Sequence, residues 1–152
     1  MKIYAKSKGK SNDEYYNRLP LPSQVKRLGK YLKDNLMGVY KVKEPPNEYT
    51  IYTTVFYQID PEVRKMLKKY PKEFQGKEED IYEMNIYLNI TTYGQYVRVN
   101  VIQLDQYEQT LGYMRLEPKD LISLPYCKDK IVKYVKRVIE KKYKDDGYEV
   151  LI

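Results

Sequence analysis

The chain of 152 residues contains no histidine and no tryptophan, one cysteine and two phenylalanines. Without histidine, Ser-His-Asp and Cys-His nucleophiles, acid–base catalysis by imidazole and nearly all zinc sites are excluded. The single Cys127 excludes an intramolecular disulfide and a thiolate metal cluster, and it fits a reducing compartment. The Walker phosphate loop and the Gly-rich dinucleotide fingerprint are also missing, which argues against NTPases and nicotinamide enzymes.

Long apolar runs are missing too. The amino terminus lacks the apolar core of a signal peptide, and no window approaches ~18 apolar residues. We therefore expect a soluble cytoplasmic protein with no membrane association. The length fits one domain over residues 1–152. Within it, Gly, Ser, Asn and Asp predict a mobile loop over residues 7–18.

The clearest structural pattern lies in residues 81–116. Apolar and polar side chains alternate over residues 82–91 and again over 97–101, as expected for half-buried strands. Breaks at residues 93–94 and 105–109 leave only short connections, which favour an antiparallel meander over parallel crossovers. The sequence therefore predicts that residues 81–116 form three consecutive antiparallel strands.

The remaining patterns complete an α+β fold. Residues 39–43 and 49–59 are rich in β-branched and aromatic residues and predict two further strands. Apolar stripes at helical spacing over residues 25–36 and 128–144 predict helices that cover a sheet. We expect an antiparallel sheet of about five strands with helices packed against one face.

Charge is distributed unevenly along the chain, whose net charge is +7. Residues 128–144 contain eight basic and two acidic residues, whereas residues 78–120 contain eight acidic and three basic ones. One interpretation is a solvated helix that uses lysine as a good helix former. The other is a surface that binds phosphates or another acidic partner. Its candidate residues are Lys133, Lys136, Arg137, Lys141 and Lys144.

Tyrosine is abundant, with 19 residues. A low-GC coding genome and ordinary sheet packing both explain such enrichment, but tyrosine also suits half-exposed sheets and interfaces. The local acidity of the meander argues against base stacking there and favours contact with a basic protein groove. The candidate residues for this protein contact are Glu83, Tyr87, Tyr93, Tyr96, Tyr107, Glu108 and Tyr113.

One enzymatic alternative survives these exclusions. Asp105 followed by Glu117-Pro118-Lys119 loosely resembles the acid…Glu-X-Lys spacing of nucleases that hold Mg²⁺ with carboxylates. A helix that begins at Pro118 explains the same residues without chemistry. We therefore expect no catalytic residues, no metal and no cofactor, and we keep a metal-dependent nuclease as a minor alternative.

The opening residues Met-Lys-Ile-Tyr-Ala-Lys-Ser resemble the start of small proteins carried by mobile elements and phages of Gram-positive bacteria. The profile of one small, charge-polarised α+β domain without catalytic motifs also resembles anti-CRISPR inhibitors. This resemblance implies stoichiometric binding to an RNA-guided nuclease, with its nucleic-acid groove or nuclease domain blocked, and it assigns no functional residue.

We therefore expect a non-enzymatic binding or inhibitor module with a protein partner, a nucleic-acid enzyme. The alternative is a mobile-element accessory protein that binds nucleic acid through the basic helix alone.

Overall fold

The computed structural model describes residues 21–63, 81–105 and 107–151. The predicted mobile loop at residues 7–18 and the acidic residues at 78–80 lie outside these ranges. In chain order, the elements are α2 (Leu21–Asn35), β1 (Val39–Lys43), β2 (Glu48–Ile59), β3 (Tyr82–Tyr93), β4 (Tyr96–Gln103), β5 (Gln109–Leu116), the 3-10 helix η2 (Asp120–Ile122), α4 (Leu124–Lys142) and β6 (Tyr148–Leu151).

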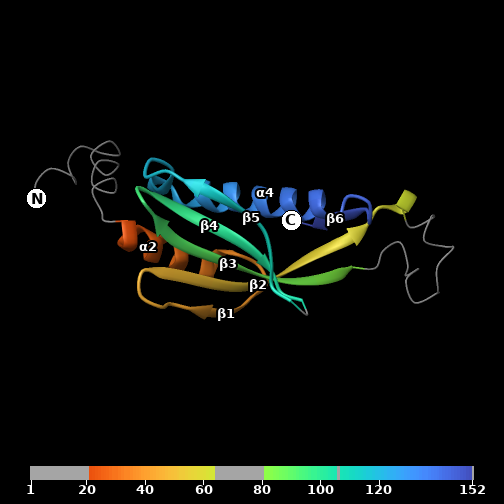
Figure 1. Ribbon diagram of the computed structural model, residues 1–152, viewed down its shortest axis with the longest axis horizontal. Coiled ribbons are helices and arrows are strands. Elements are labelled where there is room, and N and C mark those ends of the chain that lie inside the picture. Colours follow the sequence, from red (N-terminus) through yellow and green to blue (C-terminus); the bar gives the residue numbers. More distant parts are fainter. Residues whose placement is uncertain (1–20, 64–80, 106, 152) are drawn as a thin grey trace, which may run out of the picture.

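The strands form a single antiparallel sheet in the order β1-β2-β3-β4-β5 (Figure 1). Strand β2 is long enough to pair with β1 along its first half and with β6 along residues 56–59. Strands β3 to β5 follow one another in space as they do in sequence, because the connections between them are short. The predicted antiparallel meander and the α+β class are therefore confirmed.

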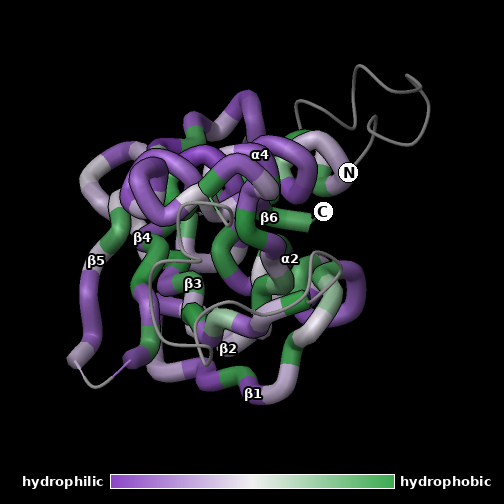
Figure 2. Tube along the Cα trace, turned by 90° about the vertical axis from the view of Figure 1, so that its right-hand side faces the viewer, coloured by the Kyte–Doolittle hydropathy of each residue, from purple (hydrophilic) through white to green (hydrophobic). Residues whose placement is uncertain are grey.

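Helices α2 and α4 lie on the same side of the sheet, which curves past them from β5 to β1 (Figure 2). The covered face carries the apolar residues of each strand, such as Ile86 in β3 and Val99 in β4. These side chains form one buried cluster with Leu28 from α2 and Ile131 from α4. The predicted cover of one sheet face by helices is confirmed, and the alternate strand residues are left on an open face.

Helix α4 begins four residues before the predicted start, because Ser123 caps it. The backbone N–H of Tyr126 donates to Ser123 Oγ at 3.3 Å, and a proline occupies the first turn. The helix ends at Lys142, so Lys144 lies in the turn before β6. Within the described ranges, no helix is both long and apolar enough to cross a membrane.

The thiol of Cys127, in the first turns of α4, is buried, with its Sγ 2.8 Å from the carbonyl oxygen of Asp120. Burial, and to a smaller extent the charge of Asp120, raises the pKa of this thiol to about 11, from an ordinary value of 9.0. As pH rises, the unfolded chain therefore loses this proton before the folded chain does.

The free energy of unfolding should consequently fall between about pH 9 and pH 11, by about 1 kcal/mol per pH unit from this group. Replacing Cys127 with alanine removes the contribution, so urea unfolding of that variant should show a shallower decline over the same pH range. An equal decline in both proteins would contradict this assignment.

Candidate functional site

The open face of the sheet combines tyrosine, asparagine and arginine side chains. The antiparallel register places Arg98 of β4 opposite Arg115 of β5, and Asn100 of β4 opposite Tyr113 of β5. On the other side of β4, Asn100 faces Asn89 of β3. These residues alternate with the buried ones, so one continuous polar and aromatic surface crosses β3, β4 and β5.

Two arginines stack on the tyrosines of this surface. The guanidinium carbon of Arg98 lies 3.7 Å from the ring centroid of Tyr113 and 4.9 Å from that of Tyr93. The guanidinium of Arg115 lies 4.0 Å from the ring centroid of Tyr96. Stacking holds each planar group by its face and leaves N–H groups on its edge, which is the geometry that binds phosphate or carboxylate.

A groove of about 510 Å³ runs between β5 and α4, and we call it the β5–α4 groove. Tyr134 lies against β5, where its hydroxyl is 2.5 Å from the position that a Cβ of residue 112 would take. Glycine at position 112 therefore permits this close approach of the Tyr134 hydroxyl to β5. The groove is lined by Tyr113, Met114, Arg115, Lys130, Lys133, Tyr134 and Arg137.

The β5–α4 groove has positive charge in excess. Two of its cations have acidic partners: Arg115 Nε lies 2.5 Å from Glu117, and Lys130 Nζ lies 3.5 Å from Asp120. Among the residues that the structure describes, no ion pair involves Lys133 or Arg137, and both are exposed. An anion in the groove therefore meets two uncompensated positive charges beside two compensated ones.

The structure divides the five basic residues predicted for binding an acidic partner. Lys133 and Arg137 line the groove, whereas Lys136 lies on the opposite flank of α4. There its Nζ is 3.0 Å from Glu140 and donates to the carbonyl oxygen of Val150 at 2.9 Å. Lys141 and Lys144 are exposed outside the groove lining. The other two groove cations, Arg115 and Lys130, were not identified from the sequence.

The seven residues predicted to contact a protein partner are all at least partly exposed. Glu83, Tyr87, Tyr93, Tyr96 and Tyr113 lie on the open face, and Tyr107 and Glu108 lie in the β4–β5 connection. The Tyr87 hydroxyl donates to Glu108 Oε2 at 3.0 Å. Burial first and this hydrogen bond second raise the pKa of Tyr87 to about 12, from an ordinary value of 10.0.

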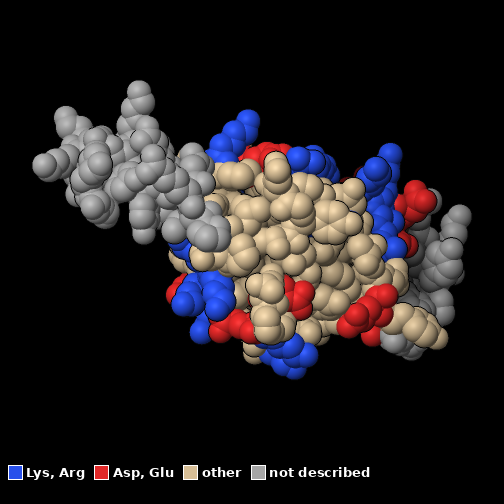
Figure 3. Space-filling model, turned by 60° about the vertical axis from the view of Figure 1, so that its left-hand side comes forward, with Lys and Arg blue, Asp and Glu red and all other residues tan. Residues whose placement is uncertain are grey.

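Tyr113 changes the interpretation of the two predicted surfaces. It belongs to the tyrosine set, yet it lines the same groove as Lys133 and Arg137. The open face also carries cations of its own, including Arg98 and Arg115. Figure 3 shows one side of the molecule on which blue and red side chains both surround a central area of uncharged ones. The predicted contrast between a basic helix and an acidic meander therefore does not describe the β5 edge of the sheet, where Arg115 and the α4 cations line one groove.

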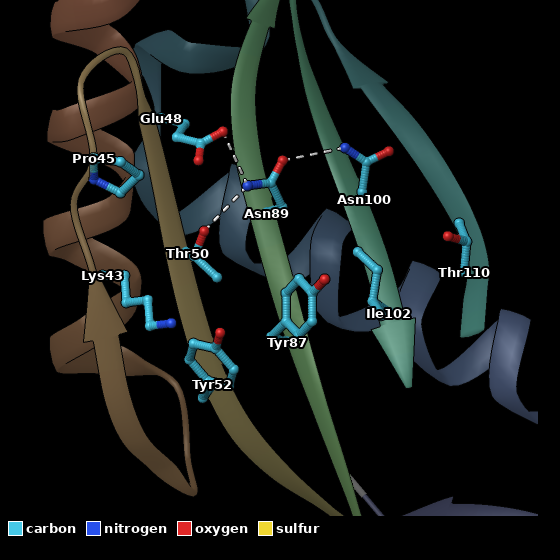
Figure 4. A pocket seen from close by; sticks show the side chains of 10 residues that line it. All are labelled: Lys43, Pro45, Glu48, Thr50, Tyr52, Tyr87, Asn89, Asn100, Ile102 and Thr110. Carbon is cyan, nitrogen blue, oxygen red and sulfur yellow. Dashed lines mark hydrogen bonds between the residues drawn. The ribbon is translucent and has the colours of Figure 1, made fainter. Parts of the chain in front are cut away.

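A second hollow, of about 420 Å³, lies on the open face itself, and we call it the open-face pocket. Figure 4 shows a polar row formed by Glu48, Asn89 and Asn100, with the rings of Tyr52 and Tyr87 beyond it. The pocket is lined by Lys43, Pro45, Glu48, Thr50, Tyr52, Tyr87, Asn89, Asn100, Ile102 and Thr110. Among these residues, only Tyr87 was predicted from the sequence as a binding residue.

The residues proposed for a nuclease do not come together. Asp105 follows β4 and Glu117 follows β5, and because these strands are antiparallel the two carboxylates lie at opposite ends of the hairpin, roughly 20 Å apart. Glu117 pairs with Arg115 instead. In the described part of the chain, no group of three or more potential metal ligands is assembled.

No protein-family model matches this chain, and neither a curated protein nor a solved structure matches it. Its function is therefore inferred from the residues of the groove and the pocket.

Proposed function

We propose that the protein is a non-enzymatic module that binds single-stranded nucleic acid, with the phosphate backbone in the β5–α4 groove. The observation that carries this proposal is the convergence of four cations from two elements in one groove beside two tyrosine rings. Lysine and arginine bind phosphates and release condensed counterions, which supplies affinity without sequence specificity. A groove of this composition fits a polyanion better than a neutral ligand.

The exposed rings favour a single strand over a duplex. Tyr113 is 52% exposed and Tyr93 is 54% exposed, and the guanidinium of Arg98 lies beside both rings. Bases stack on such rings only when they are unpaired, because a duplex hides their faces. Phosphates in the groove and bases on the adjoining open face would therefore occupy neighbouring surfaces.

The proposal predicts that removing two groove charges weakens binding. We expect Lys133→Gln with Arg137→Gln to raise the Kd for a labelled single strand about tenfold at moderate salt. Fluorescence anisotropy measures this directly, with a duplex of equal length as a second ligand that should bind less tightly. Far-UV circular dichroism and thermal unfolding check that the variant is folded.

The matched control is Lys26→Gln with Lys30→Gln. These lysines are exposed on α2, have the same spacing along a helix and change the net charge equally. We expect this pair to change the Kd no more than about twofold, since the long-range charge term is screened by salt. Equal weakening by both pairs would show that net charge, and not the groove, determines binding.

A protein partner is the second candidate function, and the exposed tyrosines favour it. Tyr107 is 76% exposed and lies next to Glu108, and Tyr93 is exposed at the other end of the same face. Tyrosine is enriched at protein interfaces and hot spots. Under this proposal the protein is an inhibitor of the anti-CRISPR type that occupies a basic groove of an RNA-guided nuclease.

Size-exclusion chromatography with a purified RNA-guided nuclease separates the two functions. Co-elution with the nuclease before its guide RNA is added, lost in Tyr93→Ala with Tyr107→Ala, supports the inhibitor. Failure to co-elute with nuclease in any guide-bound or guide-free state opposes it for that nuclease.

A further inference from the structure

We propose that the open-face pocket binds one unpaired base and prefers a base with an exocyclic amine. This inference rests on the proposed function, because it requires a strand whose backbone lies in the β5–α4 groove. It assigns a readout site to residues of β2, β3 and β4, which are separate from the cations of the groove.

The pocket and the groove are adjacent. Asn100 lines the pocket and pairs across β4 and β5 with Tyr113, which lines the groove. Neighbouring strands lie roughly 5 Å apart, so the nearest lining residues of the two sites are about one strand spacing apart. Arg98 lies at this junction, with its guanidinium stacked on Tyr113 and its Nε donating to Asn100 Oδ1 at 3.1 Å. A nucleic-acid strand in the groove can therefore continue across β5 and β4 onto the pocket.

The charges of the two sites differ: the cations of the β5–α4 groove favour phosphate, and the balanced charges of the open-face pocket favour a base. The groove presents Lys133 and Arg137 without acidic partners among the described residues, whereas the pocket contains one lysine, Lys43, and one carboxylate, Glu48. A carboxylate repels phosphate, but it accepts a hydrogen bond from an amine such as cytosine N4. The pocket therefore fits a neutral group that offers N–H donors.

A hydrogen-bonded chain holds the polar row of the pocket in place (Figure 4). Asn100 Nδ2 donates to Asn89 Oδ1 at 3.4 Å. Asn89 Nδ2 in turn lies 3.1 Å from Thr50 Oγ1 and 3.4 Å from Glu48 Oε2. Because an amide can donate and accept, these side chains fix the direction in which each neighbour presents its free donors and acceptors. Such pre-orientation is what reading the edge of a base requires.

The rings supply the stacking surface. Tyr52 and Tyr87 lie beside the polar row, with ring centroids 5.1 Å apart. The ammonium groups of Lys41 and Lys43 lie 5.3 and 5.6 Å from the centroid of the Tyr52 ring. Ile102 is only 7% exposed and adds an apolar side chain to the lining of the pocket. A planar base can therefore stack on an aromatic ring while its edge faces Glu48 and the two asparagines.

The test compares two pyrimidine homopolymers of equal length, oligodeoxycytidine and oligodeoxythymidine, by anisotropy competition. Both bases are pyrimidines with similar rings, and at about pH 8, where cytosine is unprotonated, they differ at the base edge, where cytosine carries an amine and thymine a carbonyl oxygen and a methyl group. We expect the wild-type protein to bind oligodeoxycytidine about tenfold more tightly. This measurement needs no variant.

Variants then locate the preference. Glu48→Gln should reduce it to about twofold or less, because an amide is a weaker acceptor than a carboxylate. Glu83→Gln is the matched control, since Glu83 is exposed on the same face outside the pocket, and it should leave the preference unchanged. Lys133→Gln with Arg137→Gln should weaken binding of both homopolymers equally and preserve the preference.

Equal affinity of the wild-type protein for both homopolymers would overturn the base pocket while leaving backbone binding in the groove intact. A preference that Glu48→Gln and Glu83→Gln alter equally would overturn it too. If neither homopolymer binds even at low salt, the proposed function fails and the pocket inference fails with it.

Discussion

Replacement of Gly29 by alanine should lower the free energy of unfolding by about 2 to 3 kcal/mol, although alanine is the better helix former. Gly29 lies in the middle of α2, where the helix meets Tyr49 of β2. A Cβ at position 29 would overlap the Tyr49 ring, including Cδ2 at 2.6 Å. Tyr49 is only 1% exposed and cannot move away without disturbing the core that joins α2 to the sheet.

Urea unfolding of three variants isolates this contact. Lys30→Ala, at the next and exposed position of α2, should change stability by no more than about 0.5 kcal/mol. Adding Tyr49→Leu to Gly29→Ala should recover part of the loss, since the smaller side chain makes room for the new methyl group. Wild-type stability in Gly29→Ala would show that the helix and the ring are not in close contact.

Reversing the two uncompensated groove charges should have a larger effect on binding than neutralising them. Lys133→Glu with Arg137→Glu places two carboxylates where the phosphate backbone lies, so attraction becomes repulsion close to β5. We expect the Kd for a single strand to rise about 100-fold, as measured by anisotropy at constant salt. Both side chains are exposed, so the change should leave the thermal unfolding temperature nearly unaltered.

The control for charge reversal is Lys26→Glu with Lys30→Glu on α2. It imposes the same change in net charge at a site that does not line the groove. We expect it to raise the Kd severalfold at most, through long-range repulsion that added salt removes. A 100-fold loss in the control as well would mean that the groove has no special role.

The meander was predictable because its signal is local. Alternation around Ile86, Leu88 and Ile90 specifies which face of β3 is buried, and a shift by one residue would expose all three. The short connections then determine the strand order. The start of α4 was missed because the apolar stripe begins later than the cap at Ser123, whose side chain contacts only the next turn.

The groove was not predictable because its residues come from separate elements. Arg115 belongs to an edge strand and Lys130 to a helix, and nothing in their spacing places them side by side. The flank of α4 that faces β5 also depends on tertiary packing, which brings Lys133 to the groove and Lys136 to β6. A count of charges along residues 128–144 does not distinguish lysines that lie on different sides of α4.

The open-face pocket was not predictable either, because its residues come from separate strands and become neighbours only through the strand register. Asn89 and Asn100 read as ordinary polar positions of two strands, and they become neighbours only when β3 and β4 pair in the observed register. Glu48 then joins them from the start of β2. The only sequence signal for the pocket was a tyrosine at an alternate position of a strand. It identified Tyr87 but not the side-chain amides of Asn89 and Asn100.

The salt dependence of binding to oligodeoxycytidine tests the central claim most directly. If Lys133 and Arg137 contact phosphates, log K should fall linearly with log salt, and Lys133→Gln with Arg137→Gln should make the slope shallower by about 1.4. Lys26→Gln with Lys30→Gln should leave the slope unchanged. A slope that is the same in the groove variant and the wild-type protein would contradict a phosphate-binding groove between β5 and α4.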